Sequence, residues 1–229
     1  MSSAALYLIP TGLGGAPDEV LPPSTVQAVR ALRDFAVENA KSARAFLAAV
    51  RMPCAMRELR ISEIGEDADA LLAPLRAGRA LGVLTEAGCP GIADPGQALA
   101  AAAQAAGFRV VPLVGPSSLL LALMASGLEG QRFAFCGYLP REREPRAERI
   151  RALERRSREA RETQIFIETP YRSDALLAAL LTACADDTRL CVAVDLTLAG
   201  ESIATRTIRE WRRASPTLGR RPAVFLLLA

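Results

Sequence analysis

The sequence predicts an α/β protein with two domains, residues 1–114 and 115–229. In the first half, short apolar runs alternate with helical patterns, which is typical of a parallel sheet covered by helices. The second half has five short apolar runs but only two long helical patterns, which favours a mixed sheet. Between the halves, Val114-Gly115-Pro116-Ser117-Ser118 interrupts regular structure, and we place the domain boundary there.

The first domain is expected to contain five strands, at residues 6–9, 35–37, 59–64, 80–84 and 109–113. Its helices begin near Pro22-Pro23-Ser24, then at residues 43, 67 and 97. Ser24 or Thr25 is the expected N-cap of the first of these helices, and Asp67 or Asp69 of the third, because short polar side chains satisfy free backbone N–H groups.

The second domain is expected to open with a helix at 119–126. Strands follow at 133–136, 164–167, 190–194, 202–207 and 223–228, and long helices at 145–160 and 174–184. The helix at 145–160 is rich in Arg and Glu. Pairs four residues apart, such as Glu154 with Arg158, indicate a solvated helix stabilised by its own ion pairs.

Composition excludes several classes of protein. With 229 residues and 51% apolar content, the chain can bury a substantial core, and no apolar run approaches the roughly 18 residues that span a bilayer. The N-terminal Met1-Ser2-Ser3-Ala4-Ala5 lacks the positive charge of a secretory signal. We therefore expect a cytoplasmic protein that does not interact with membranes.

The absence of histidine narrows the chemistry further. It excludes Ser-His-Asp hydrolysis and histidine-bound zinc, and the five scattered cysteines contain no C-x-x-C pair, so no metal site is expected. Any acid or base must be Asp, Glu, Tyr, Cys, the single Lys41 or water. This favours a reaction in which a cofactor performs the difficult step.

Positive charge is concentrated in the second half of the chain. Residues 141–161 hold nine Arg and five Glu, and residues 206–221 hold six Arg and one Glu. This excess suits contacts with phosphate, although the 141–161 stretch lacks the interleaved aromatic residues that stack on bases. A solvated helix explains much of the first segment equally well.

Three loops follow predicted strands of the first domain at the same edge of its sheet. They are Pro10 to Gly15, Thr85 to Gly96, and Gly115 to Ser118. Ligands of open parallel sheets bind outside the carboxyl ends of the strands, and glycine lets the backbone approach a ligand closely. The loops match neither G-x-G-x-x-G nor a P-loop, and an ordinary strand-to-helix turn is the alternative for each.

The order of several segments carries a resemblance to a known family. In the first domain and at the boundary, these segments are, in chain order, Leu6-Tyr7-Leu8-Ile9-Pro10-Thr11, Glu86-Ala87-Gly88-Cys89-Pro90-Gly91-Ile92-Ala93-Asp94-Pro95-Gly96 and Val111-Pro112-Leu113-Val114-Gly115-Pro116-Ser117-Ser118. In the second domain they are Ser126-Gly127-Leu128, Gly137-Tyr138-Leu139-Pro140 and Glu168-Thr169-Pro170-Tyr171-Arg172. The chain resembles the tetrapyrrole methylase superfamily along nearly its whole length, and within it the ribosomal RNA small-subunit methyltransferase I group.

The resemblance implies that S-adenosylmethionine binds in a cleft between the two domains. The cofactor-binding residues it implies are Pro10, Glu86, Ala87, Gly88, Cys89, Ile92, Gly115, Ser117, Ser118, Leu139, Pro222 and Ala223. The residues it implies for substrate binding are Lys41, Arg44, Asp94, Tyr171 and Arg172. It also implies a homodimer.

The chain departs from the group's pattern in segments that would face the acceptor. Glu38-Asn39-Ala40-Lys41 stands where the group has E-D-T-R, Glu86 replaces Asp, and Tyr171 replaces His. If the acceptor is a hydroxyl, Glu38 or Glu168 is our hypothesis for the catalytic base. A cap or one half of an ion pair is the alternative role for either carboxylate.

Three functions follow from this sequence. The first is methylation of RNA, similar to 2′-O-methylation of ribosomal RNA. The second is methylation of a tetrapyrrole or another small metabolite with the same cofactor. The third is a non-catalytic interaction protein that retains the fold, which the altered residues 39–41 motivate.

Overall fold

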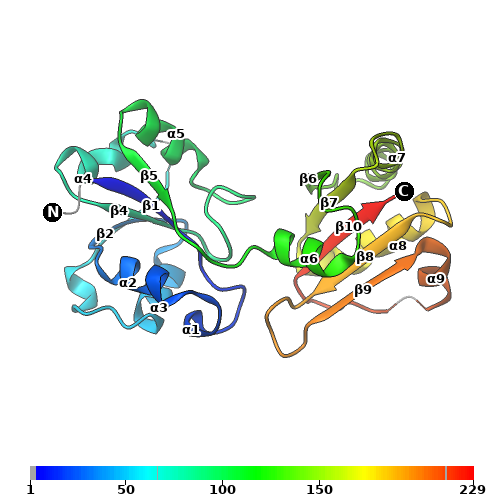
Figure 1. Cartoon of the computed structure of the whole chain (residues 1–229), viewed down its shortest axis with the longest axis horizontal. Helices are drawn as coiled ribbons and strands as arrows, with labels where there is room; N and C mark the ends of the chain where they lie inside the picture. The colour runs from blue at the N-terminus through cyan, green and yellow to red at the C-terminus, as the bar shows by residue number, and fades with distance from the viewer. Residues whose placement is uncertain (1–3, 66, 215) are drawn as a thin grey trace. The chain divides into compact units, whose positions relative to one another are not determined.

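A computed structural model describes residues 4–65, 67–214 and 216–229, so Met1, Ser2 and Ser3 of the N-terminal segment lie outside it. The chain divides into two compact units, Met1–Ser117 and Ser118–Ala229. Each unit contains one five-stranded sheet (Figure 1). Within the described residues, no helix is both long and apolar enough to cross a membrane.

The sheet of the first unit is entirely parallel, with strand order β3-β2-β4-β1-β5. Its strands are β1 (Ala5–Ile9), β2 (Asp34–Val37), β3 (Arg60–Glu63), β4 (Leu81–Leu84) and β5 (Arg109–Pro112). Strands β2 and β4 are buried throughout, whereas the edge strands β3 and β5 are partly exposed. The predicted parallel sheet is confirmed.

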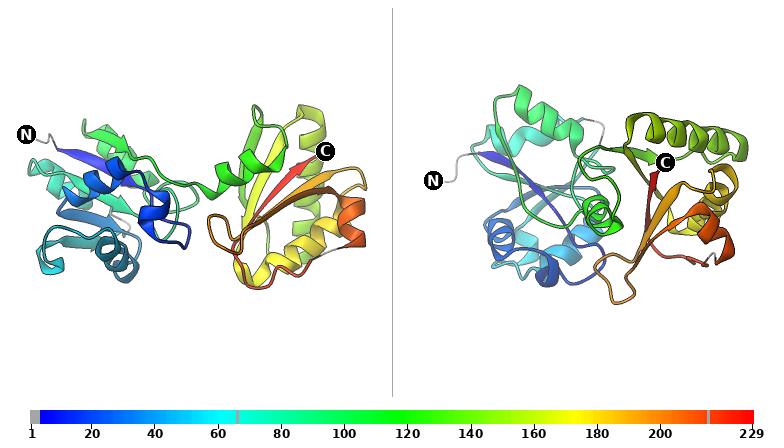
Figure 2. Two further views of the ribbon diagram at one scale, coloured as in Figure 1. Left: turned by 60° about the horizontal axis from the view of Figure 1, so that its bottom comes forward. Right: turned by 45° about the vertical axis from the view of Figure 1, so that its right-hand side comes forward.

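Helices cover both faces of this sheet (Figures 1 and 2). The helical segments of the unit are α1 (Pro17–Val20), α2 (Pro23–Arg30), α3 (Ala40–Ala49), η1 (Met56–Glu58), η2 (Ala70–Leu72), α4 (Ala73–Arg76) and α5 (Gln97–Ala105). One apolar cluster joins Val29 of α2 and Leu47 of α3 to Phe35 of β2. A separate cluster joins Leu75 of α4 and Leu99 of α5 to the same sheet. Two cores on opposite faces are what a doubly wound sheet requires.

One predicted helix cap is wrong, and the other holds for Asp67 alone. Helix α2 begins after Pro22, which has no side-chain cap bond, and the buried Thr25 hydroxyl instead donates to the carbonyl oxygen of Val114 at 2.7 Å. The segment after Asp67 forms the short turn η2 and then α4, not one continuous helix. Asp67 does accept a hydrogen bond from the backbone N–H of Ala70 at 3.0 Å, whereas Asp69 makes no cap bond.

The second unit has a mixed sheet with strand order β6-β7-β10-β8-β9, which confirms the predicted class. Its strands are β6 (Phe133–Tyr138), β7 (Thr163–Glu168), β8 (Arg189–Val194), β9 (Ser202–Thr207) and β10 (Ala223–Leu228). Only the β6–β7 pair is parallel. The helical segments are α6 (Ser118–Ser126), α7 (Arg143–Ala160), η3 (Pro170–Arg172), α8 (Ser173–Ala183) and α9 (Ile208–Arg213).

Helix α9 was absent from the sequence prediction, although its start signal is present. Thr207 and Glu210 form a reciprocal capping box at its first turn. Trp211 anchors the helix, because its side chain is buried and its indole N–H donates to the carbonyl oxygen of Leu190 at 2.8 Å. Six residues are too few for helical periodicity to stand out in the sequence.

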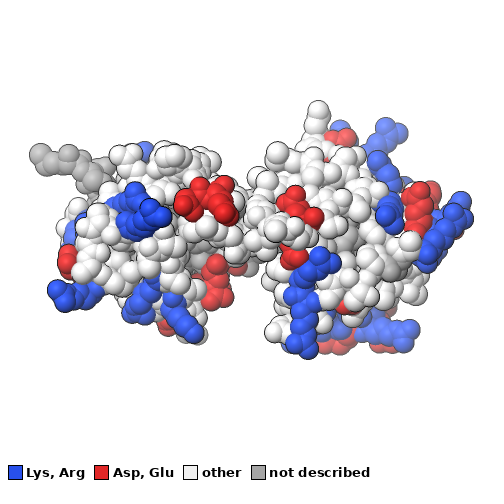
Figure 3. All heavy atoms as spheres, turned by 90° about the horizontal axis from the view of Figure 1, so that it is seen from below, with Lys and Arg blue, Asp and Glu red and all other residues white. Residues whose placement is uncertain are grey.

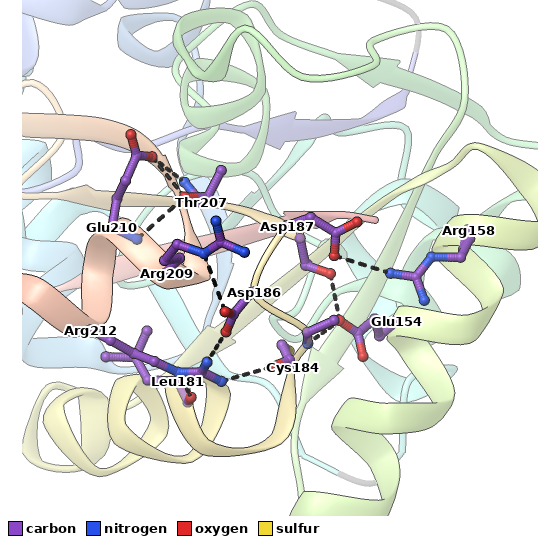
Figure 4. Close-up of polar contacts among 12 residues, drawn as sticks. Glu154, Arg158, Leu181, Cys184, Asp186, Asp187, Thr207, Arg209, Glu210 and Arg212 are labelled. Carbon is purple, nitrogen blue, oxygen red and sulfur yellow. Dashed lines mark hydrogen bonds and ion pairs between the residues drawn. The ribbon is translucent and has the colours of Figure 1, made fainter.

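The predicted ion pair between Glu154 and Arg158 is replaced by contacts to the turn between α8 and β8 (Figure 4). Glu154 is buried, and its Oε1 accepts hydrogen bonds from the Ala185 N–H at 2.8 Å and the Thr188 hydroxyl. Arg158 pairs with Asp187. One face of α7 therefore packs against the turn between α8 and β8 and is not exposed to solvent.

Candidate functional site

The three predicted loops meet within the first unit, at the carboxyl edge of its sheet. The backbone N–H of Thr11, after β1, donates to the carbonyl oxygen of Gly88, after β4, at 2.8 Å. The Sγ of Cys89 lies 3.4 Å from the carbonyl oxygen of Pro116 in the third loop. A Cβ atom on Gly115 would lie 2.3 Å from Cγ of Pro10, so the close approach of the first and third loops requires glycine there.

Topology explains why a crevice forms at this edge. The chain leaving β1 crosses β4 to reach β2, whereas the chain leaving β4 crosses β1 to reach β5. The two connections leave neighbouring strands in opposite directions and cover opposite faces of the sheet. Such a switch point is where open parallel sheets bind ligands.

A cavity of about 510 Å³ opens beside these loops within the first unit. It is lined by Leu8, Pro10, Cys89, Pro90, Gly91, Ile92, Gly96, Gln97, Ala100, Ala101, Gln104, Pro112 and Leu113. Small-molecule sites typically enclose roughly 300–1,000 Å³ and are mostly apolar with a few polar groups. This cavity fits that description, with Gln97 and Gln104 as its polar side chains.

Three of the predicted cofactor residues, Pro10, Cys89 and Ile92, line the cavity. Glu86, Ala87, Gly88, Gly115 and Ser117 belong to the adjoining loops but are not among its lining residues. The α5 residues, such as Ala100 and Gln104, escaped the sequence prediction. Their i, i+4 spacing places them on one face of α5, but only the folded position of that helix shows that this face lines a cavity.

The loop from Gly88 to Gly96 has an unusual backbone. Gly88, Gly91 and Gly96 have positive φ angles, and so does Ala93 at 64°. A non-glycine residue in this region is uncommon and its conformation costs free energy. The bond from the N–H of Gly91 to the carbonyl oxygen of Pro95, 3.0 Å long, closes the turn and holds it in shape.

Three carboxylates gather at the same edge. The backbone N–H of Glu86 donates to Oε2 of Glu38 at 2.9 Å, which ties the end of β2 to the β4 loop. Burial and the negative charges of Glu38 and Glu86 raise the pKa of Asp94 to about 6. Asp94 therefore releases its proton close to neutral pH, and the edge is most negative above that value.

The segment Glu38 to Lys41 has a structural role that the sequence analysis missed. Asn39 caps helix α3, since its Oδ1 accepts hydrogen bonds from the N–H groups of Lys41 and Ser42 at 2.9 and 3.1 Å. The side chains of Lys41 and Arg44 are exposed on the first turns of this helix. The change at position 39 therefore preserves a helix start next to Glu38.

In the second unit, Glu168 and Arg172 form a buried ion pair. Oε1 of Glu168 accepts hydrogen bonds from Nη2 of Arg172 at 2.5 Å and from the Thr169 N–H at 2.7 Å. The side chain of Glu168 is fully buried, and within the described chain its Oε2 and the Nη1 of Arg172 are buried without a hydrogen-bond partner. The proposed role of Glu168 as a base stays a prediction, and the geometry favours its alternative role in an ion pair.

The other predicted residues of the second unit are distributed around its sheet. Ala223 is the cross-strand partner of Glu168, and the carbonyl oxygen of Pro222 accepts the Asp195 N–H at 3.1 Å. Leu139 follows β6 and is buried, and Ser118 is the first residue of α6. The Tyr171 side chain, by contrast, is 76% exposed. No group of three acidic, cysteine or histidine side chains that could hold a metal occurs among the described residues.

Several arginines of the basic segments are neutralised by nearby carboxylates. Arg156 pairs with Glu162, and Arg209 and Arg212 both pair with Asp186. In the view of Figure 3, basic side chains are interspersed with acidic ones on both units. The charge available for a polyanion is thus smaller than the sequence count indicates.

The fold of this chain also occurs in solved structures of other proteins. The structure of the chain is similar to the crystal structure of the methyltransferase CobJ, with a TM-score of 0.62 over 99% of this chain and 94% of that one, at 20% identity. The chain belongs to the tetrapyrrole (corrin/porphyrin) methylase family, whose model matches residues 5–211. The predicted family, fold class and methyltransferase activity are thereby confirmed.

Two relatives carry a more specific name. Proteins named "Ribosomal RNA small subunit methyltransferase I" from Mesorhizobium japonicum and Synechocystis sp. are each 32% identical to this chain. The first alignment covers 90% of this chain and 68% of the relative, and the second covers 84% and 67%.

Proposed function

We propose that this methyltransferase uses S-adenosylmethionine to methylate RNA. The main support for RNA as the acceptor is the similarity to proteins named as ribosomal RNA methyltransferases, which extends over 84–90% of the chain. The excess of arginine at residues 141–161 and 206–221 supports the same class, because polyanions bind by displacing counterions.

The cavity of the first unit suits the donor. Its apolar walls, including Ile92 and Leu113, fit a flat base, and the backbone of the β4 loop offers polar groups for the rest of the nucleoside. The carboxylates of Glu86 and Asp94 favour a positively charged sulfonium nearby. Pro10, Ala87, Gly88, Cys89, Gly115 and Ser117 complete the proposed donor site in this unit.

S-adenosylmethionine, when bound, would supply a methyl group activated by a positively charged sulfur. The residues of this chain would align the acceptor oxygen, exclude water and take up its proton. Without histidine, a carboxylate is the natural proton acceptor. Glu38 is the better candidate. Among the described residues its side chain makes one hydrogen bond, with the Glu86 N–H, and it is not held in an ion pair as Glu168 is.

Transfer of a labelled methyl group from S-adenosylmethionine tests this function. We expect label in RNA when the enzyme is incubated with total RNA from a strain lacking its gene, and none in a small-metabolite extract. Glu38→Gln should lower turnover by at least roughly tenfold, since general base catalysis contributes about 10²–10⁴-fold. The affinity of the Glu38→Gln variant for S-adenosylmethionine should change little.

Glu168→Gln serves as the matched variant. If Glu168 only stabilises the fold, this variant should melt at a lower temperature but keep its turnover per folded molecule. Full activity in both glutamine variants would reject Glu38 and Glu168 as the base, and label confined to the metabolite extract would reject RNA as the acceptor.

Methylation of a small molecule is the second candidate. The description of the matching family, tetrapyrrole (corrin/porphyrin) methylases, favours it. Salt separates the two candidates, because RNA affinity falls steeply with ionic strength and the affinity for a small, weakly charged acceptor does not.

A further inference from the structure

Tyr171 is an exposed aromatic residue with a guanidinium on one face. Its side chain is 76% exposed, and Cζ of Arg220 lies 5.1 Å from the centroid of its ring. The two residues are 49 positions apart, so the sequence alone does not pair them. An arginine over one face leaves the opposite face of the ring open to a second planar group.

Hydrogen bonds hold the segment that carries Arg220 in place. Tyr171 lies in η3, the turn that precedes α8. From the first turn of α8, the Asp174 carboxylate accepts the N–H groups of Leu218 and Gly219 at 2.6 and 3.2 Å, which fixes the segment that carries Arg220. A platform that is already ordered loses little conformational entropy when a ligand binds.

Two further arginines adjoin the stack in sequence, Arg172 after Tyr171 and Arg221 after Arg220. Each is paired with a carboxylate, Arg172 with Glu168 and Arg221 with Asp195, which leaves Arg220 as the cation for a phosphate. Arg172 is held by Glu168 and Thr169, and its buried Nη1 has no hydrogen-bond partner within the described residues. Because this atom has no accessible surface, the platform itself consists of Tyr171 and Arg220.

A structural role for the stack is the simplest alternative. An exposed cation–π pair stabilises a fold only weakly, which does not explain why so much of an aromatic ring stays in water. An aromatic surface flanked by arginines is instead the combination that proteins use for unpaired nucleotides, whose bases stack while their phosphates contact the cations.

We propose that the open face of Tyr171 stacks on an unpaired base of the RNA acceptor, with Arg220 beside the neighbouring phosphate. This inference rests on the proposed RNA function and adds its mode of recognition. It requires single-stranded RNA, because a base within a duplex cannot expose its face to a side chain.

Binding of labelled 12-nucleotide RNAs, single-stranded and in a duplex of the same sequence, tests the platform. Tyr171→Ala should weaken single-strand binding by roughly 5- to 150-fold, which corresponds to the 1–3 kcal/mol of one stacked base. Tyr171→Phe keeps the ring and should bind like the wild type. Duplex binding should be the same in all three proteins.

Arg220→Ala and the exposed Arg57→Ala remove equal charge from different units. The first should weaken single-strand binding clearly more than the second. Equal losses in the alanine and phenylalanine variants of Tyr171, or no loss in either, would overturn stacking. If methyl label still enters RNA in that case, the proposed function stands and only the platform fails; if the wild type binds no RNA and transfers no label to it, both fail.

Discussion

Asp34 shows what a single buried carboxylate contributes in this fold. It accepts two hydrogen bonds of 2.6 Å from Arg60, and Arg79 adds a weaker contact at 3.2 Å. The hydrogen bonds from Arg60 lower the pKa of Asp34 despite its burial. Because both arginines are about half exposed, they can be hydrated if the carboxylate is removed, which limits the cost.

Asp34→Asn should therefore reduce the free energy of unfolding by about 2 kcal/mol at pH 7. A lowered pKa in the folded state stabilises the protein above the ordinary aspartate value, and this stabilisation is lost as the pH falls through the folded value. The difference between wild type and variant should thus shrink below about pH 4. Urea unfolding across pH measures it.

Asp69→Asn is the matched control. Asp69 pairs with Arg76 on the surface, where an ion pair contributes at most about 1 kcal/mol. An equal loss in the two variants, or a difference for Asp34 that grows in acid, would contradict this account.

For individual residues, the sequence predicts which side chains matter better than it predicts which residues they contact. It identifies Glu38, Glu86, Asp94 and Glu168 as carboxylates at strand ends or in loops. The structure brings the first three to one edge, whereas Glu168 belongs to the second unit. The sequence could not pair Thr25 with Val114 or Tyr171 with Arg220, because these contacts depend on how distant segments fold together.

Among the elements, α7 shows how a buried polar residue can be hidden in a charged sequence. Its arginines and glutamates predict a solvated helix, yet Glu154 is buried against the turn before β8. Periodicity finds apolar faces, and a lone glutamate on the buried face has no such signal. Strands, by contrast, were found within one or two residues, because runs of buried apolar residues are distinctive.

Glu154→Ala should cost about 3 kcal/mol of stability, because the Ala185 N–H and the Thr188 hydroxyl lose their acceptor in a buried place. Glu159→Ala, at an exposed position of the same helix, should cost less than about 0.5 kcal/mol. Thermal and chemical unfolding of both variants measure the difference. If both variants lose a similarly small amount of unfolding free energy, the hydrogen bonds of Glu154 to the turn do not stabilise the protein.

For the molecule as a whole, the sequence predicted the class of each sheet but not the order of its strands. Alternation of apolar runs and helices predicts a parallel sheet, and the switch point between β1 and β4 then follows only from the order β3-β2-β4-β1-β5. With that strand order, the loops after β1 and β4 lie on either side of one crevice. The same order also explains why the α5 residues of the cavity escaped prediction.

Calorimetry with S-adenosylmethionine tests the central claim, that the crevice of the first unit binds the methyl donor. We expect micromolar-range binding by the wild type, and a loss of at least about tenfold in affinity, or ~1.4 kcal/mol, in Ala100→Phe, which fills the cavity. Ala48→Phe, at an exposed alanine of α3, should bind like the wild type. No binding by the wild type, or undiminished binding by the filled variant, would contradict the account.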